Sequence, residues 1–147
     1  MRHFIRSMIL LLVFSCGAAI AHTATTTSEH AKAAGFKVLL EVNSADPVTW
    51  HNAVNNATQI MQVVGMDKAQ VEVVAWGAGI KMLAKGSPVA EHVQSLSDYG
   101  VSFVACGNTM KALHMSPKDL IAGVKVVPGA IGEIVKRDHE GWTQIKM

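Results

Sequence analysis

The chain has 147 residues, of which half are hydrophobic, and carries 13 Lys and Arg against 11 Asp and Glu. This length suits one domain, and such a domain closes a core without disulfides. The formal net charge of +2 is too small for a surface that binds nucleic acid or an anionic membrane, because both require a basic excess.

The first 21 residues follow the three-part pattern of a secretory signal peptide. Arg2 and Arg6 are basic, residues 8–14 (MILLLVF) are continuously apolar, and Ala19 and Ala21 fit the small residues before a cleavage site. The apolar run is too short to span a bilayer permanently. We therefore expect cleavage after Ala21, a periplasmic or secreted protein, and no membrane attachment after processing. A retained N-terminal anchor helix and a lipoprotein with a lipidated Cys16 stay open as alternatives.

Cleavage would remove two arginines and no acid, which leaves 11 basic and 11 acidic residues. A neutral mature chain again argues against nucleic acid as a partner. Residues 22–34 (HTATTTSEHAKAA) are polar and rich in Thr and Ala, which is typical of a disordered lead-in. The folded domain is therefore expected at residues 35–147.

Five short apolar runs indicate strands. They are rich in Val, Leu and Ile without strict alternation, which is typical of strands that are covered on both faces of a parallel sheet. The runs are residues 36–42, 71–76, 101–105, 124–127 and 142–146, the last being the weakest.

Helical patterns separate these strands. The clearest one starts at Pro47, with Asp46 or Ser44 as cap, shows apolar residues every three or four positions, and ends at Gly65. Shorter patterns occupy residues 89–96, 116–119 and 130–135. Strands that alternate with helices predict an α/β fold, namely a three-layer α/β/α sandwich with a mainly parallel sheet of about five strands.

Functional sites in such sheets form where loops leave the carboxyl ends of the strands. Residues 43–46, 77–87 and 106–109 follow three of the expected strands, so we expect them at one edge of the sheet. Gly77-Ala78-Gly79 lacks the third glycine of a dinucleotide-binding fingerprint, and a backbone-permissive loop explains it better. No cofactor is expected.

Cys106 is the only cysteine that remains after the expected cleavage, and it lies where a strand passes into a helical pattern. Unpaired N–H groups at the start of the next helix favour the thiolate, which is the nucleophilic form. Gly107 would let other groups approach the sulfur, Asn108 or Thr109 would cap the helix, and Lys81 and Lys85 would add positive potential. We expect a partly exposed thiol with a lowered pKa.

Two other interpretations of this cysteine remain. Cys106 is a small buried hydrophobe in the first, and the protein is then a non-catalytic binding module. In the second, Cys106, Met110 and His114 share one helix face through their spacing of four residues. Thiolate, thioether and imidazole are soft ligands, so the protein would then be a small Cu(I) carrier.

The domain resembles the DsrE/DsrF-like proteins of sulfur relay. The resemblance covers residues 37–146 and is carried by KVLLEVNSADP, VEVVAWGAGIKMLAKGS, VSFVACGNTM and VKVVPGAIGEIVKRDHEGWTQIK. It implies a five-stranded α/β/α fold, assembly as trimers, hexamers or related hetero-oligomers, and a cysteine after the third strand that accepts sulfur as a persulfide. Cys106 alone matches that position.

The leading hypothesis is therefore an exported sulfurtransferase or sulfur carrier that accepts sulfane sulfur on Cys106. Its partners would be sulfur donor and acceptor proteins or small thiols, and the protein would be a homo-oligomer. The relay proteins that it resembles act in the cytoplasm, so a secretory signal implies other partners than theirs.

The N-terminal pattern generates a prediction about processing. When the full chain is produced in a host that exports it, the purified protein should begin at His22 and carry no lipid. Mass spectrometry of the intact protein measures this directly. A mature chain that begins at a lipidated Cys16, or one that retains residues 1–21, would contradict the prediction.

Overall fold

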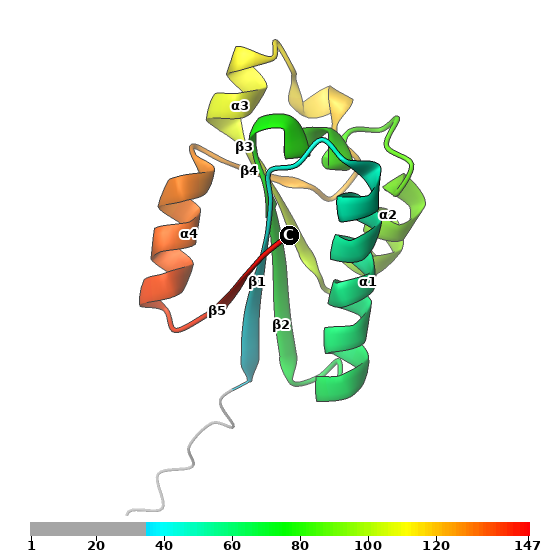
Figure 1. The fold of residues 1–147 in the computed structure, drawn as a ribbon, viewed down its shortest axis with the longest axis vertical. Helices are drawn as coiled ribbons and strands as arrows, with labels where there is room; N and C mark the ends of the chain where they lie inside the picture. Colours follow the sequence, from blue (N-terminus) through cyan, green and yellow to red (C-terminus); the bar gives the residue numbers. More distant parts are fainter. Residues whose placement is uncertain (1–34) are drawn as a thin grey trace, which may run out of the picture. The chain divides into compact units, whose positions relative to one another are not determined.

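A five-stranded parallel sheet with helices on both faces forms the domain in the computed structural model, which describes residues 35–147 (Figure 1). The sheet order is β4-β3-β2-β1-β5, and every neighbouring pair is parallel. The strands are β1 (Phe36–Val42), β2 (Ala69–Ala75), β3 (Ser102–Cys106), β4 (Lys125–Val127) and β5 (Thr143–Lys146). The predicted α/β/α sandwich is confirmed. The expected signal peptide (1–21) and lead-in (22–34) lie outside the described residues.

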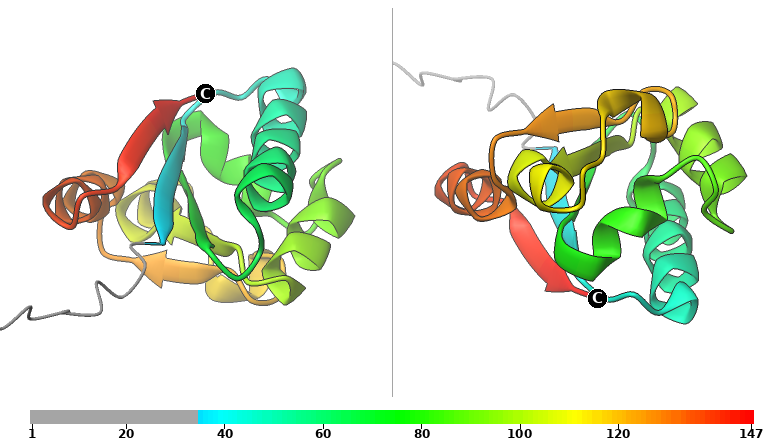
Figure 2. Two further views of the ribbon diagram at one scale, coloured as in Figure 1. Left: turned by 90° about the horizontal axis from the view of Figure 1, so that it is seen from below. Right: turned by 90° about the horizontal axis from the view of Figure 1, so that it is seen from above.

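Helices lie on both faces of the sheet (Figures 1 and 2). The helices are α1 (Pro47–Val64), α2 (Ala90–Asp98), α3 (Gly107–Ala112) and α4 (Ala130–His139), with 3-10 helices η1 (Gly77–Leu83) and η2 (Pro117–Asp119). Helices α1 and α2 lie on one side, and α4 lies alone on the other. The segment 77–87, expected as a loop, contains η1, because Ile80, Met82 and Leu83 are fully buried in the core there.

The caps of α1 follow the sequence signals. The Asp46 carboxylate accepts a hydrogen bond from the Val48 N–H at 3.0 Å, and Pro47 occupies the first turn, where no intrahelical N–H bond is lost. Gly65 ends the helix with a φ of 97°, which favours glycine. These signals fix the connection between β1 and α1 at the carboxyl end of the sheet.

The sheet separates two apolar clusters of unequal size. Alternate strand residues such as Leu40, Val73 and Phe103 face α1 and α2 and form the larger core. The smaller cluster lies under α4 and contains five buried residues, which are Leu39, Val74, Val104, Cys106 and Ala130. Cys106 therefore belongs to the side of the sheet that α4 covers.

An ion pair attaches α4 to the sheet. Ala130 is the only α4 residue that is fully buried, so apolar contact alone holds the helix weakly. Glu72 of β2 is 1% exposed, and Arg137 of α4 contacts both of its oxygens, Nη2 to Oε2 at 2.6 Å and Nε to Oε1 at 3.1 Å. The Arg137 guanidinium also stacks on Trp142, 4.6 Å from the ring centroid. The bidentate pair fixes the position of α4 along β2.

The parallel registers bring the three segments 43–46, 77–87 and 106–109 to one edge of the sheet, as predicted. In Figure 1 this edge is the upper one, where α3 and η1 lie. Within residues 35–147, no helix is both long and apolar enough to cross a bilayer.

Replacing Arg137 should destabilise the domain. Arg137→Met leaves the buried Glu72 carboxylate without its cation, which should cost about 3 kcal/mol of unfolding free energy. The matched control is Lys136→Met. The Lys136 side chain is 58% exposed, and loss of its 3.8 Å contact with Glu133 should lower the unfolding free energy by less than about 1 kcal/mol. Urea denaturation followed by circular dichroism measures both.

The double variant Glu72→Met/Arg137→Met sharpens this test. It removes both charges, so it should recover most of the stability that Arg137→Met loses. If the single and double variants lose the same stability, apolar packing and not the ion pair holds α4.

Candidate functional site

Cys106 is the last residue of β3, and α3 begins directly after it. Its backbone is still extended, with φ −73° and ψ 112°, so the residue is the N-cap of α3 and does not lie on the helix. Its side chain points to the α4 side of the sheet, where it packs in the smaller apolar cluster. Cys106 therefore lies at the carboxyl edge, as the sequence predicted.

The connection from β4 to α4 covers the thiol. The Ala130 N–H donates to Cys106 Sγ at 3.3 Å, and the Asn108 N–H donates to the Pro128 carbonyl at 3.1 Å. A Cβ on Gly107 would lie 2.9 Å from the Val127 carbonyl oxygen, so only glycine permits this approach. Cys106 is consequently 5% exposed, and the expectation of a partly exposed thiol is wrong.

The pKa of Cys106 is lowered by hydrogen bonds. Burial is the largest influence and raises the pKa, but the Thr109 hydroxyl and the backbone N–H groups of Thr109, Ala130 and Asn108 together lower it below its ordinary value. These donors stabilise the thiolate over the thiol. The predicted direction of the pKa shift is confirmed, although part of its cause was unexpected.

The unexpected donor is the N-terminus of α4. The sequence suggested that the helix directly after the cysteine would supply the N–H groups, and Asn108 and Thr109 do so. Ala130 lies 24 residues further along the chain, and nothing in the local sequence indicates its contact with the sulfur. Only the placement of β4 beside β3 brings α4 to Cys106.

Thr109 joins the thiol to the neighbouring strand end. Its Oγ1 accepts a hydrogen bond from the Gly77 N–H at 3.0 Å, and its hydroxyl donates to Cys106. The bond from Gly77 therefore joins η1 directly to α3, beside the sulfur. The expected capping role of Asn108 or Thr109 is wrong, since Cys106 occupies the N-cap position and both residues lie within α3.

Lys81 and Lys85, both expected near the thiol, lie in different places in the structure. Lys81 lines a groove of about 510 Å³ beside α3, together with Asn108 and Thr109. Lys85 lies at Asp119 instead, where its N–H donates to the Asp119 carbonyl at 3.0 Å. The pKa of the Asp119 carboxyl is lowered first by the backbone and hydroxyl of Ser116, and the charge of Lys85 adds to this. Lys81 alone remains beside the site.

The structure does not bring the expected Cu(I) ligands together. Met110 is buried in the larger core, whereas Cys106 belongs to the smaller cluster under α4. Helix α3 ends at Ala112, so His114 follows it, exposed and with a φ of 54°. The three residues do not share a helix face, and the Cu(I) interpretation is wrong for this reason.

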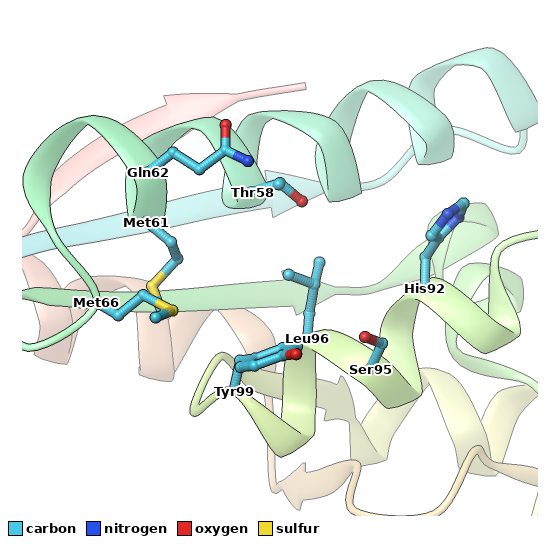
Figure 3. Close-up of a pocket in the computed structure, with 8 residues that line it drawn as sticks. All are labelled: Thr58, Met61, Gln62, Met66, His92, Ser95, Leu96 and Tyr99. Carbon is cyan, nitrogen blue, oxygen red and sulfur yellow. The ribbon is translucent and has the colours of Figure 1, made fainter.

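A groove lies between α1 and α2 (Figure 3). Met61 and Leu96 of its wall belong to the larger core, so the groove is on the opposite face of the sheet from Cys106. Its volume is about 420 Å³, and Met61, Met66, Leu96 and Tyr99 give it an apolar wall. It contains no cysteine, so it offers no thiol that could accept sulfur. Cys106 remains the candidate reactive group.

The protein has a parallel α/β fold with a hydrogen-bonded cysteine at the carboxyl end of its third strand. The family model of the DsrE/DsrF-like family matches residues 11–147. The chain therefore belongs to the DsrE/DsrF-like family. A search of curated proteins gave no match.

Solved structures share the fold. A protein of unknown function from Methanobacterium thermoautotrophicum, MTH1491, is 32% identical, with a TM-score of 0.73 over 76% of this chain and 99% of its own. The ychN protein from E. coli is 13% identical, with a TM-score of 0.67 over 76% and 99%. BT1422 from Bacteroides thetaiotaomicron is 15% identical, with a TM-score of 0.60 over 76% and 94%.

Thr109 should control the ionisation of Cys106. Thr109→Val keeps the shape of the side chain but removes the hydroxyl donor, so the pKa of Cys106 should rise above the wild-type value. Thr109→Ser keeps the hydroxyl and is the matched control. The rate of iodoacetamide labelling against pH reports both. Equal pKa values in the Val and Ser variants would show that the hydroxyl does not act on the sulfur.

Proposed function

We propose that the protein accepts sulfane sulfur on Cys106 as a persulfide and passes it to an acceptor thiol. The observation that carries the proposal is the set of N–H and O–H donors around Cys106 Sγ, which lowers the pKa of the thiol in a member of the DsrE/DsrF-like family. Membership suggests a function of the sulfur-relay type. The persulfide step on Cys106 is our own assignment.

The proposed step exchanges one sulfur–sulfur bond for another. The Cys106 thiolate attacks the outer sulfur of a donor persulfide, R–S–SH, and a bond forms between Sγ and that sulfur. The bond from the outer to the inner sulfur breaks, and its electron pair leaves on R–S⁻, which takes up a proton. No net oxidation occurs, so the step needs no cofactor. An acceptor thiolate removes the sulfur by the same reaction in reverse.

The Cys106 donors would serve both directions of this exchange. They stabilise negative charge on Sγ, which is the attacking group during loading and the leaving group during release. Lys81 and the groove beside α3 lie next to Thr109 and give a donor or acceptor a place to approach. Donor and acceptor are sulfur-carrying proteins or small thiols in this proposal, and the pattern of residues 1–21 supports an exported location for them.

The fold restricts the access of a sulfur donor to Cys106 Sγ. Because Cys106 is 5% exposed, a donor reaches it only when the connection between Val127 and Ala130 moves away from Sγ. Such local opening occurs in folded proteins without global unfolding. We therefore expect loading to be limited by this opening.

The same burial favours a second candidate function. A cysteine that is 5% exposed in an apolar cluster also suits a purely structural residue in a binding module. A structural cysteine takes up no sulfur from a persulfide donor and destabilises the fold when it is replaced. Its behaviour therefore separates the two functions.

Cys106→Ser should abolish sulfur loading and keep the fold. The wild type, incubated with glutathione persulfide, should gain the mass of one sulfur atom, and a reducing thiol should remove it. The hydroxyl of serine fits the same space and accepts the same N–H groups, so circular dichroism and melting should change little. Loading of the serine variant, or a wild type that gains no sulfur while the variant unfolds, would refute the proposal.

We also expect assembly into a trimer or hexamer. The described part of the chain exposes large apolar side chains, including Val63 at 86%, Ile131 at 63% and Val135 at 62%, which subunit contacts would bury. Sedimentation velocity at roughly tens of micromolar should show the oligomer. A monomer at that concentration would contradict this expectation.

A further inference from the structure

A second site lies on the α4 side of the sheet, at the carboxyl end of β1. It is a cavity of about 260 Å³ between the sheet and α4. Its apolar walls come from Trp76, Ile131, Ile134 and Met147, and its polar groups from Glu41, Asn43, Gln144 and Lys146. This cavity is distinct from the groove beside α3, with which it shares no residue.

Glu41 is the buried carboxylate of this cavity. It is 4% exposed, and its Oε1 is buried and accepts no hydrogen bond from residues 35–147. Glu72, the other buried acid of the domain, is held by Arg137 on both of its oxygens. A buried carboxylate without a donor is unfavourable, and a group that donates to it recovers the loss. A hydrogen-bond donor from outside residues 35–147 would therefore stabilise the buried Glu41 Oε1.

Lys146 places a positive charge beside Glu41 without neutralising it. The two residues are register partners on the neighbouring parallel strands β1 and β5. Both line the cavity, but no ion pair within 4.0 Å joins them. Lys146 is exposed, whereas Glu41 is buried. The cavity therefore presents an anion at its depth and a cation at its mouth, side by side.

The amides add neutral hydrogen-bonding groups. Gln144 donates through Nε2 to the Ile134 carbonyl at 3.5 Å and to Asp138 Oδ1 at 3.0 Å, which fixes the side chain and leaves its oxygen as an acceptor. Asn43 lies at the edge, directly after β1, where its amide is exposed. A ligand ammonium has acceptors in Glu41 and Gln144, and a ligand carboxylate has donors in Lys146 and Asn43.

We propose that this cavity binds a small zwitterion of the α-amino-acid type, with its ammonium at Glu41, its carboxylate at Lys146 and its side chain against Trp76. The negative Glu41 and the positive Lys146 match the ammonium and the carboxylate of an amino acid. A simple anion or a simple amine would match only one of these two protein charges. The proposal goes beyond the persulfide function of Cys106 and does not require it.

The test uses S-methyl-L-cysteine, which has no free thiol and cannot exchange sulfur with Cys106. Addition up to about 10 mM should shift the Trp76 indole N–H resonance saturably, in the millimolar range or tighter. Two matched probes each lack one charge: 3-(methylthio)propionate has no ammonium, and S-methylcysteamine has no carboxylate. Each should bind about tenfold more weakly or not at all.

Three variants complete the experiment. Glu41→Gln keeps the shape and removes the anion, and Lys146→Met removes the cation; each should weaken S-methyl-L-cysteine binding by about tenfold or more. Lys125→Met, on the exposed edge strand β4, is the control and should leave binding unchanged. Circular dichroism confirms that each variant is folded.

Several results would overturn the proposal. The site does not exist as described if the wild type shows no saturable shift, or if Glu41→Gln binds as tightly as the wild type. If Glu41→Gln instead changes the sedimentation coefficient at fixed concentration, the donor to Glu41 belongs to a second copy of the chain. Because sulfur loading of Cys106 is measured separately by mass, failure here leaves the persulfide function to its own test.

Discussion

The ion pair between Glu72 and Arg137 is the interaction on which the candidate site depends. Helix α4 buries only one residue completely, so its apolar face would tolerate sliding along the sheet. The bidentate contact with the central strand β2 fixes the helix in one position. That position brings the first N–H of α4 to Cys106 Sγ at 3.3 Å and also forms one wall of the cavity at Glu41.

The environment of Cys106 balances two opposing effects. Burial in an apolar cluster disfavours the thiolate, whereas the Ala130 N–H of α4 and the hydroxyl and N–H of Thr109 in α3 favour it, and these donors prevail. The same arrangement closes the site to solvent, since the segment that brings Ala130 to the sulfur also covers it. The segment at Ala130 therefore both stabilises the thiolate and shields it from solvent. A sulfur donor must displace this connection between β4 and α4 to reach the thiol.

The sequence predicted the fold and the place of Cys106 because both depend on local patterns. Val-rich runs such as that in β2, the caps around Pro47 and the strand-to-helix corner at Cys106 are each read within a few residues. The burial of Cys106, the role of Ala130 and the separation of Met110 from the thiol depend instead on which strands are neighbours. The unpartnered Glu41 gave no signal, since an acid inside an apolar strand also suits an exposed position.

The donors around Sγ, which α4 helps to hold in place, should make Cys106 a thiolate at lower pH than an ordinary cysteine. The most direct measurement is the pH titration of the Cys106 Cβ resonance in protein labelled with ¹³C-cysteine. We expect a pKa below the ordinary value of about 8.5 in the wild type, and a higher pKa in Arg137→Met than in the wild type. A wild-type pKa at or above the ordinary value, or one that Arg137→Met leaves unchanged, would contradict this expectation.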